Sequence, residues 1–559
     1  MQNLVEFNDA MALISINRKI FEKEIGKLNE EMQHKIAMLG TPIDKIDENE
    51  LQIEIFPNRP DMLSYHGFKR SFLAFLEKQK GMKKYKINKP ENDFIVNIDP
   101  SVSNVRPYTA CAVVKKLKLD NEKIKELIDI QEKLHITIGR KRKKLAIGIY
   151  PLEKIKFPIT FTALEPDKIK FIPLEMDKEL SGLQILQKHP TGREYAHLLA
   201  GKEKFPIFID ANNSILSMPP VINSQLAGKI TEETRDVFVE CSGFDFSVLS
   251  KCLNIIVSTL SDMGGEIYQM KLNYRKNKKI TPDFSPEKLK INIENANKML
   301  GIKLNENHVK KLLEKMGHDY SKGIVEIPPW RTDILHEVDL IEDIAIAYGY
   351  DNFVPEIPEI STIGGENQRE IIKRKISEIL SGMEMLEVMN YHLTNKKDQF
   401  EKMGIKAGKD FIEIEESKTD YNVLRKDLSH YLMKILSENV DSEYPQKIFE
   451  LGKIFLLKNN EVAEEENLSL ASAPSNFTEL RQVLEYLFRM LNLGDKITIK
   501  EPESFPSYFA EGRIGEIFLD TKSIGFIGEI HPKILKNWHM KMPVALLEIS
   551  LEEVFKKLE

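Results

Sequence analysis

Four carboxylates lie close together near position 340 and form the most distinctive group of candidate ligands in this chain. They are Asp333, Asp339, Glu342 and Asp343. Carboxylate oxygens are the preferred ligands of hard cations. They can also receive the basic surface of a partner protein. The spacing therefore fits a cation site or a partner contact, and it also fits the solvated polar face of an ordinary amphipathic helix.

A helix must position these carboxylates if they act together. From Ile334 onward, apolar residues recur at helical spacing and predict one buried stripe. The stripe consists of Ile334, Val338, Ile341, Ala345 and Tyr348. At about 100° per residue, Asp339, Glu342 and Asp343 fall on the opposite side. Asp333 precedes them and is expected to cap the helix N-terminus.

Hydroxyl and carboxyl side chains also gather near the ends of predicted strands in the middle of the chain. They occur in segments 189–197 (HPTGREYAH), 217–223 (SMPPVIN), 234–236 (TRD) and 240–243 (ECSG). They could line a hydrolytic pocket, and turn formation or helix capping explains them about equally well. The G-x-S-x-G and H-E-x-x-H motifs are both absent, so a positioned water is the expected nucleophile of any hydrolysis.

Two shorter segments carry cations near predicted turns. Residues 140–144 are five consecutive Lys or Arg residues just before the predicted strand LAIGIY. Such a run either binds phosphate backbones or forms a solvated hairpin tip. Residues 58–61 (NRPD) either present Arg59 from a rigid loop or form a turn in which Asp61 caps the next helix.

Length and composition indicate a multidomain protein of ordinary globular type. At about 150 residues per domain, the 559 residues predict three to four domains. A net charge of −6 is too small for general coating of nucleic acid, although it permits a local basic groove. We expect a cytoplasmic protein without a membrane span, because there is no signal-peptide pattern, no long apolar run and no cysteine pair with metal-ligand spacing.

The chain is predicted to be an α+β protein of four domains. The predicted boundaries are 1–88, 89–275, 276–355 and 365–559. The second segment alternates strands and helices, and the third is a small helix-rich module of winged-helix size. The last segment predicts an antiparallel sheet with flanking helices, and it contains neither a Walker A loop nor a G-x-G-x-x-G motif after a strand.

Taken in order, several of these segments resemble the beta subunit of phenylalanyl-tRNA synthetase of the archaeal and eukaryotic type. FPNRPDMLS resembles the N-terminal domain of that family. GRKRKKLAIGIY, HPTGREYAHLL, SMPPVINS and TRDVFVECSG resemble its B3/B4 editing domain, and PPWRTDILHEVDLIEDIAIAYGYDN resembles its B5 domain. LRKDL, FELGKIF and IGFIGEIHPKIL resemble its class II catalytic-like module. The resemblance covers nearly the whole chain.

The resemblance implies an α2β2 enzyme that joins phenylalanine to tRNA(Phe) with ATP and Mg²⁺, the ATP being bound by the alpha subunit. The C-terminal module is expected to be inactive, because KIFELGKIF lacks the arginine pattern of a class II site and no G-x-G-x-E-R follows. The resemblance further implies that Asp333, Asp339, Glu342 and Asp343 bind Mg²⁺ shared with the alpha subunit. Asp343 stands where the family commonly has Glu.

For editing, the resemblance points to Ser217, Glu240 and Ser242. These residues would position a water and recognise the hydroxyl of tyrosine attached to tRNA(Phe) by mistake. A site for phenylalanine gains limited discrimination by excluding one hydroxyl, so a second pocket is physically reasonable. The usual T-G-T-D pattern is replaced here by residues 242–245 (SGFD). The alternative functions are a stand-alone tRNA-editing hydrolase and a non-catalytic tRNA-binding scaffold.

Overall fold

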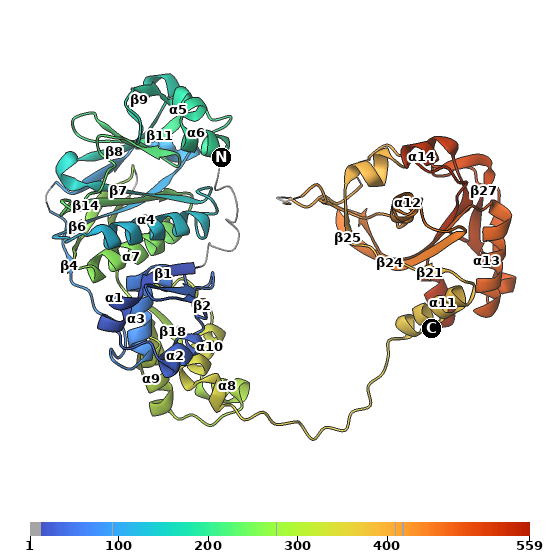
Figure 1. The fold of residues 1–559 in the computed structure, drawn as a ribbon, viewed down its shortest axis with the longest axis horizontal. Coiled ribbons are helices and arrows are strands. Elements are labelled where there is room, and N and C mark those ends of the chain that lie inside the picture. Colours follow the sequence, from blue (N-terminus) through green and yellow to red (C-terminus); the bar gives the residue numbers. More distant parts are fainter. Residues whose placement is uncertain (1–12, 92, 276, 409, 416, 418) are drawn as a thin grey trace. The chain divides into compact units, whose positions relative to one another are not determined.

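The computed structural model describes residues 13–559 apart from 92, 276, 409, 416 and 418. It contains several β-sheets with helices packed on them (Figure 1). The chain divides into two compact units, residues 1–357 and 358–559, and each is described by itself. The boundaries predicted inside the first unit stay predictions. Among the described residues, no helix is both long and apolar enough to cross a membrane.

A small antiparallel sheet opens the first unit. Its strands, in spatial order, are β1 (Leu13–Asn17), β3 (Glu50–Glu54) and β2 (Ile43–Ile46). The helices of this region are α1 (Arg18–Glu24), α2 (Glu30–Met38) and α3 (Tyr65–Phe75). Burial alternates along β3, so one face of the sheet contributes to the core.

Helix α3 begins later than the sequence predicted. Its N-cap is Ser64, whose hydroxyl accepts a hydrogen bond from Gly67 N at 3.1 Å. Asp61 is buried and instead accepts a hydrogen bond from Arg59 Nε at 2.9 Å. The capping role predicted for Asp61 is therefore wrong, because its carboxylate compensates a buried guanidinium.

Two larger sheets form the middle of the first unit. The five-stranded sheet contains, in spatial order, β4 (Ile87–Asn88), β15 (Glu266–Tyr268), β6 (Tyr108–Lys115), β14 (Val237–Gly243) and β7 (Leu145–Pro151). The seven-stranded sheet contains β13 (Ile222–Asn223), β12 (Ile215–Met218), β11 (Phe205–Ile209), β8 (Ile159–Leu164), β5 (Ile95–Ile98), β16 (Met270–Asn273) and β17 (Lys278–Thr281). Between β8 and β11 lie β9 (Lys170–Phe171), β10 (Leu180–Ser181), α5 (Gly182–Lys188) and α6 (Pro190–Tyr195).

Strand β14 lies between β6 and β7, and all of its residues are buried. Helices α4 (Asn121–Ile136) and α7 (Phe246–Asp262) cover one face of this sheet (Figure 1). Val237, Val239 and Cys241 belong to the core on that face, whereas Phe238 belongs to the core shared with the seven-stranded sheet. Because strand side chains alternate, Glu240 and Ser242 follow Phe238 to the second face.

The third region of the first unit is a three-stranded sheet with three helices. Its strands are β18 (Glu287–Lys290), β20 (Ile324–Ile327) and β19 (Asp319–Ser321), and its helices are α8 (Ile293–Leu300), α9 (Glu306–Lys315) and α10 (Glu337–Tyr348). Helix α10 packs on α9 and α8. It is the predicted acidic helix, and it begins three residues after the predicted start at Ile334.

The second unit is built on a seven-stranded sheet. In spatial order its strands are β21 (Leu386–Glu387), β24 (Gln446–Lys458), β25 (Glu461–Ala473), β29 (Ala545–Ser550), β28 (Lys522–Ile530), β27 (Phe509–Leu519) and β26 (Ile497–Lys500). All neighbouring pairs are antiparallel except β21 with β24. A separate short pair joins β22 (Leu393–Thr394) and β23 (Val423–Leu424).

Helices cover both faces of the seven-stranded sheet. The core that contains Phe449 includes α11 (Gln368–Gly382), α13 (Phe477–Met490) and α15 (Glu552–Leu558). The core that contains Ile448 includes α12 (Ser429–Glu438) and α14 (Pro532–Asn537). Adjacent residues of β24 thus enter different cores, as the alternation of a strand buried on both faces requires.

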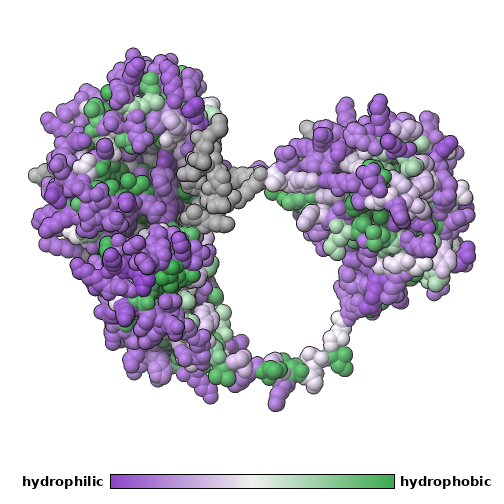
Figure 2. All heavy atoms as spheres, viewed as in Figure 1, coloured by the Kyte–Doolittle hydropathy of each residue, from purple (hydrophilic) through white to green (hydrophobic). Residues whose placement is uncertain are grey.

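Polar and charged side chains dominate the surface visible in Figure 2, as the 30% content of charged residues leads us to expect. A few large apolar side chains are nevertheless exposed. At and beyond strand β21, Leu386, Met389 and Tyr391 are 67%, 92% and 84% exposed. Three such side chains within six residues at a sheet edge mark a candidate contact surface.

Candidate functional sites

Arg331 lies at the centre of the acidic segment and pairs with two of its carboxylates. Its Nη2 atom is 2.6 Å from Asp333 Oδ2 and 3.0 Å from Asp343 Oδ2. Nε2 of the buried His318 donates a hydrogen bond to Asp343 Oδ2 at 2.6 Å. Burial alone would raise the pKa of Asp343, but Arg331 and His318 outweigh burial and hold this pKa well below its usual range.

Asp339 performs the helix capping that was predicted for Asp333. Its Oδ2 atom accepts hydrogen bonds from the backbone N–H groups of Leu335 and His336, both at 2.7 Å. His336 is the N-cap residue, so the two side chains form a reciprocal capping box. Asp333 caps nothing, because both of its oxygens accept hydrogen bonds from Arg331. The capping prediction for Asp333 is wrong.

The faces of α10 also differ from the prediction at two positions. Val338 was placed in the apolar stripe but is 42% exposed, and Asp343 was placed on the polar face but is buried. Ile334 and Ile341 are buried as predicted. The helix is oriented by the ion pair between Arg331 and Asp343 as well as by its apolar residues, and hydrophobic periodicity alone could not include that pair.

The four carboxylates do not form a cation cage within this chain. Asp333 and Asp343 are paired with Arg331, and Asp339 binds the helix N-terminus, whereas Glu342 is exposed. Partial burial and the negative charges of the other three acids raise the pKa of Glu342. Within the described part of the chain, no three His, Cys, Asp or Glu side chains are arranged to hold a metal ion. A Mg²⁺ site at this place stays a prediction and needs further ligands from a partner.

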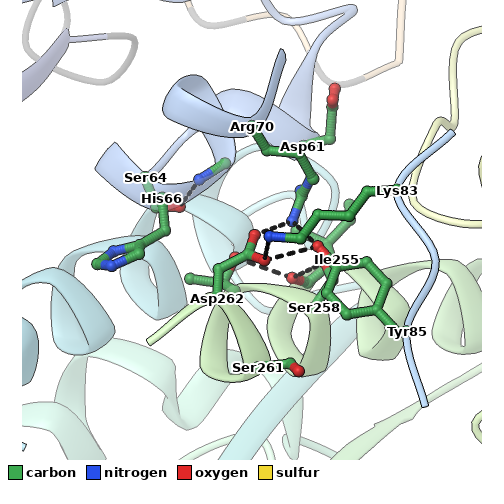
Figure 3. A network of polar contacts seen from close by, with 12 residues as sticks. Asp61, Ser64, His66, Arg70, Lys83, Tyr85, Ile255, Ser258, Ser261 and Asp262 are labelled. Carbon is green, nitrogen blue, oxygen red and sulfur yellow. Dashed lines mark hydrogen bonds and ion pairs between the residues drawn. The ribbon is translucent and has the colours of Figure 1, made fainter. Parts of the chain in front are cut away.

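A second buried ion network joins distant parts of the first unit (Figure 3). Arg70 Nη1 is 2.6 Å from Asp262 Oδ2, at the end of α7, and 3.1 Å from the Tyr85 hydroxyl. Lys83 Nζ is 2.7 Å from the other Asp262 oxygen. The Arg70 guanidinium also lies over the Trp330 ring at 4.7 Å. Helix α3, helix α7 and the segment before α10 are thereby held together.

A cavity of about 590 Å³ opens between α4, β7 and the segments around residues 174, 189 and 220. Its polar lining includes His135, Arg142, His189, Asn223 and Glu240. Apolar side chains of α4 and β7 complete the wall. A cavity of this size with a few polar groups is typical of a small-molecule site.

Glu240 is the buried acid of this cavity. Burial raises its pKa to about 8, although Arg106 acts in the opposite direction, so the side chain is protonated at neutral pH. The Tyr150 hydroxyl lies 3.3 Å from both Glu240 Oε1 and Asn223 Oδ1. Gly148 leaves room for this arrangement, because a Cβ atom there would stand 2.1 Å from the Tyr150 hydroxyl and 2.7 Å from Glu240 Oε1.

The other two predicted editing residues lie near Glu240 but do not line the cavity. The Ser217 hydroxyl is buried and makes no well-formed hydrogen bond with the described residues. The Ser242 hydroxyl accepts a hydrogen bond from Arg106 Nε at 3.1 Å, and its carbonyl accepts another from Arg106 Nη2 at 2.7 Å. Phe244, the departure from the family pattern, lies 5.5 Å from the same guanidinium and is half exposed, away from the cavity lining.

The cations of the basic segment 140–144 do not all face the solvent: four are exposed, and Arg142 points inward. Arg140, Lys141 and Arg142 have positive φ angles of 46°, 52° and 63° and form a left-handed turn after α4. Arg142 points inward, where it binds Glu132 and the Val221 carbonyl and lies over the Tyr195 ring. The segment is therefore more than a solvated tip, because one of its cations is part of the cavity wall.

Comparison with known proteins identifies the family. A model described as the phenylalanyl tRNA synthetase beta chain CLM domain matches residues 354–551, and one described as the tRNA synthetase B5 domain matches residues 289–350. The phenylalanine–tRNA ligase beta subunit of Thermococcus sibiricus is 38% identical over 509 residues, which cover 89% of this chain and 90% of that protein. The chain belongs to the phenylalanine–tRNA ligase beta subunit family.

Further relatives agree with this family membership. The beta subunit from Archaeoglobus fulgidus is 35% identical over 556 residues. The alignment covers 98% of this chain and 99% of that protein. A crystal structure of an N-terminal fragment of the Pyrococcus horikoshii phenylalanyl-tRNA synthetase beta subunit aligns with a TM-score of 0.58 at 34% identity. That alignment covers 60% of this chain and 99% of the fragment. The resemblance inferred from the sequence is confirmed.

Three residues around Glu240 and Ser242 were missed as functional candidates by the sequence analysis. Tyr150 and Gly148 lie in the strand LAIGIY, where they look like ordinary strand residues. Arg106 lies before β6, outside every motif. No local signal marks these positions, because their importance comes from the pairing of β14 with β6 and β7.

The ion pair of Arg331 predicts a large effect on stability. Arg331→Met leaves the buried Asp343 charge without its main partner, so we expect the free energy of unfolding to fall by about 3–5 kcal/mol. Denaturant titration in a Trp538→Phe background measures this, because Trp330 then reports on the first unit alone. Lys288→Met is the matched control, since it breaks an exposed pair with Glu326 and should cost less than about 1 kcal/mol. Equal effects of the two changes would contradict the assignment.

The raised pKa of Glu240 predicts a pH dependence of stability. The folded state keeps the proton up to about pH 8, whereas a glutamate in the unfolded chain has a pKa of about 4.5, so the contribution of Glu240 to stability is greatest below pH 4.5 and falls as pH rises toward 8. The slope of this contribution is at most about 1.4 kcal/mol per pH unit. Glu240→Gln should remove it, so the variant gains stability relative to the parent between pH 5 and pH 8 in parallel denaturant titrations. A constant difference across that range would disprove the protonated state.

Proposed function

We propose that this chain acts with an alpha subunit to attach phenylalanine to tRNA(Phe), as the beta subunit of a phenylalanine–tRNA ligase. The observation that carries this proposal is the match to curated beta subunits over 89–98% of the chain. ATP is bound by the alpha subunit, and the enzyme is an α2β2 heterotetramer in the cytoplasm.

The second unit supports a structural role in this enzyme. We interpret it as a class II synthetase-like module without an ATP site, consistent with its mainly antiparallel sheet. Its buried Arg425 is already paired, with Nη1 2.6 Å from Glu450 Oε1. Glu548 accepts hydrogen bonds from the backbone of Leu428 and Ser429 and from the Asn467 amide. An arginine that is neutralised by a buried carboxylate in this way is unavailable to hold a nucleotide phosphate.

The exposed residues Leu386, Met389 and Tyr391 are the best candidates for the contact with alpha. Their apolar side chains would be covered by a partner, and an interface core is enriched in aromatic residues and methionine. We interpret the third region of the first unit as a winged-helix-like B5 module that presents Glu342 to the same partner.

The cavity beneath Glu240 supports a second activity, the hydrolysis of Tyr-tRNA(Phe). A protonated Glu240 can donate a hydrogen bond to a phenolic oxygen, while the buried Tyr150 hydroxyl holds the Glu240 carboxyl in place from behind the lining. Phenylalanine offers no such partner to this carboxyl, which is the physical basis for selecting tyrosine. In this proposal Ser217 and Ser242 lie behind the cavity lining and help to position the residues that form it.

Joint purification with an alpha subunit tests the main proposal. The pair should form Phe-tRNA(Phe) only when ATP is present, and this chain alone should form none. Met389→Lys with Tyr391→Lys should weaken assembly at least about tenfold, because two charges would be buried in an apolar interface. Val462→Lys is the control, since it charges another exposed apolar position of the second unit. Failure of the unaltered pair to assemble and aminoacylate would reject the proposal.

Glu342 provides the test of the proposed Mg²⁺ site. Asp333 and Asp343 are held by Arg331, so Glu342 is the carboxylate of the four that is most open to a cation completed by alpha. Glu342→Gln in the assembled enzyme should raise the Mg²⁺ concentration required for half-maximal aminoacylation. Glu294→Gln, on helix α8 of the same region, removes the same charge elsewhere and should leave the Mg²⁺ dependence unchanged. An identical response of both variants would exclude a cation ligand at Glu342.

A further inference from the structure

His189 is a buried imidazole of the cavity whose second nitrogen has no partner among the described residues. The residue is 4% exposed, it lines the cavity, and its Nδ1 atom makes no hydrogen bond there. An unpaired buried polar atom costs about 1–3 kcal/mol. A ligand in the cavity could remove that cost.

The tautomer of His189 follows from its other nitrogen. Nε2 lies 3.0 Å from the carbonyl oxygen of Leu174. A carbonyl oxygen can only accept, so Nε2 carries the hydrogen and donates it. The neutral ring therefore presents a lone pair at Nδ1. His189 is an acceptor whose orientation is fixed before any ligand arrives.

The backbone around His189 is also fixed. The residue forms the corner between α5 and α6, where its N–H donates to Ile185 O at 3.1 Å and its carbonyl accepts from Arg193 N at 2.9 Å. Pro190 follows at the first position of α6 and restricts the corner further. The imidazole thus stands on a rigid support.

A short series of contacts connects His189 with the recognition end of the cavity. Leu174, which receives the His189 hydrogen bond, donates its own N–H to Asn223 O at 2.9 Å. The Asn223 side chain lies 3.3 Å from the Tyr150 hydroxyl, which is equally close to Glu240. His189 and Glu240 therefore belong to one wall, linked through Asn223 and Leu174.

We propose that His189 Nδ1 accepts a hydrogen bond from the α-ammonium group of the aminoacyl end of tRNA while Glu240 receives the side chain. This inference rests on the proposed editing function. The α-ammonium is the strongest donor of such a ligand, and hydrogen bonds to a charged donor are the strongest that a neutral imidazole can accept. His189 is thereby a specificity-determining residue for an esterified α-amino acid.

The test removes the donor from the ligand and the acceptor from the protein separately. The ligands are 3′-tyrosylamino-adenosine, whose amide resists hydrolysis, and its counterpart without the α-amino group. Calorimetry measures their binding to the assembled enzyme and to its His189→Gln variant. Glutamine retains an N–H near the position of Nε2, and therefore the contact with Leu174, but offers no acceptor at Nδ1. We expect His189→Gln to weaken the amino ligand about 10- to 100-fold and to leave the desamino ligand unchanged.

His189→Asn is the matched control, because its side-chain oxygen occupies roughly the position of Nδ1 while the contact with Leu174 is lost. It should bind the amino ligand better than His189→Gln does. Equal weakening of both ligands by His189→Gln, or rescue by Gln and not by Asn, would show a purely structural role and overturn the inference. Hydrolysis of Tyr-tRNA(Phe) is measured in parallel. If the parent enzyme binds the amino ligand with the expected dependence on His189 but hydrolyses nothing, the editing proposal fails and the recognition role stands.

Discussion

The first unit depends on the need to neutralise guanidinium groups that have been removed from water. Arg59, Arg70 and Arg331 are all buried, and each is paired with at least one aspartate. An unpaired charge in such a place would cost several kcal/mol, so the aspartates have little freedom to do anything else. Arg59 and Arg331 pair with aspartates nearby in the sequence, whereas Arg70 and Asp262 are 192 residues apart. The charge pairing therefore fixes how α3, α7 and the start of α10 meet.

This constraint explains where sequence reasoning succeeded and where it failed. The acidic helix, the strand VFVECSG and the antiparallel sheet near the C-terminus follow from hydrophobic periodicity, and the structure contains all three. The roles of Asp61, Asp333 and Asp343 could not be predicted in this way. Local rules assign an aspartate before a helix to the cap, and they do not include a buried arginine that competes for it. Hydrophobic periodicity predicted the helices and strands correctly, but it did not predict which groups the aspartates bind.

The cavity is a second example of what local sequence patterns cannot predict. Glu240 was identified through its resemblance to a family motif, and the structure places it in the cavity lining. Gly148 and Tyr150 come from strand β7 and Asn223 comes from β13 of the other sheet, and only the folded chain brings them to Glu240. In the sequence alone, nothing marks these residues as functional. Only the register of β14 with β7 reveals that Gly148 stands opposite Glu240.

Arg331 has a consequence for whether this part of the fold depends on a bound ion. In a cluster of carboxylates that binds a metal, the negative charges repel one another when no ion is bound. Folding of such a protein then depends on the ion. Here the guanidinium supplies an internal counter-charge to Asp333 and Asp343. The charges of Asp333 and Asp343 are therefore balanced within the chain itself. This part of the fold consequently needs no bound ion to keep its buried carboxylates from repelling one another.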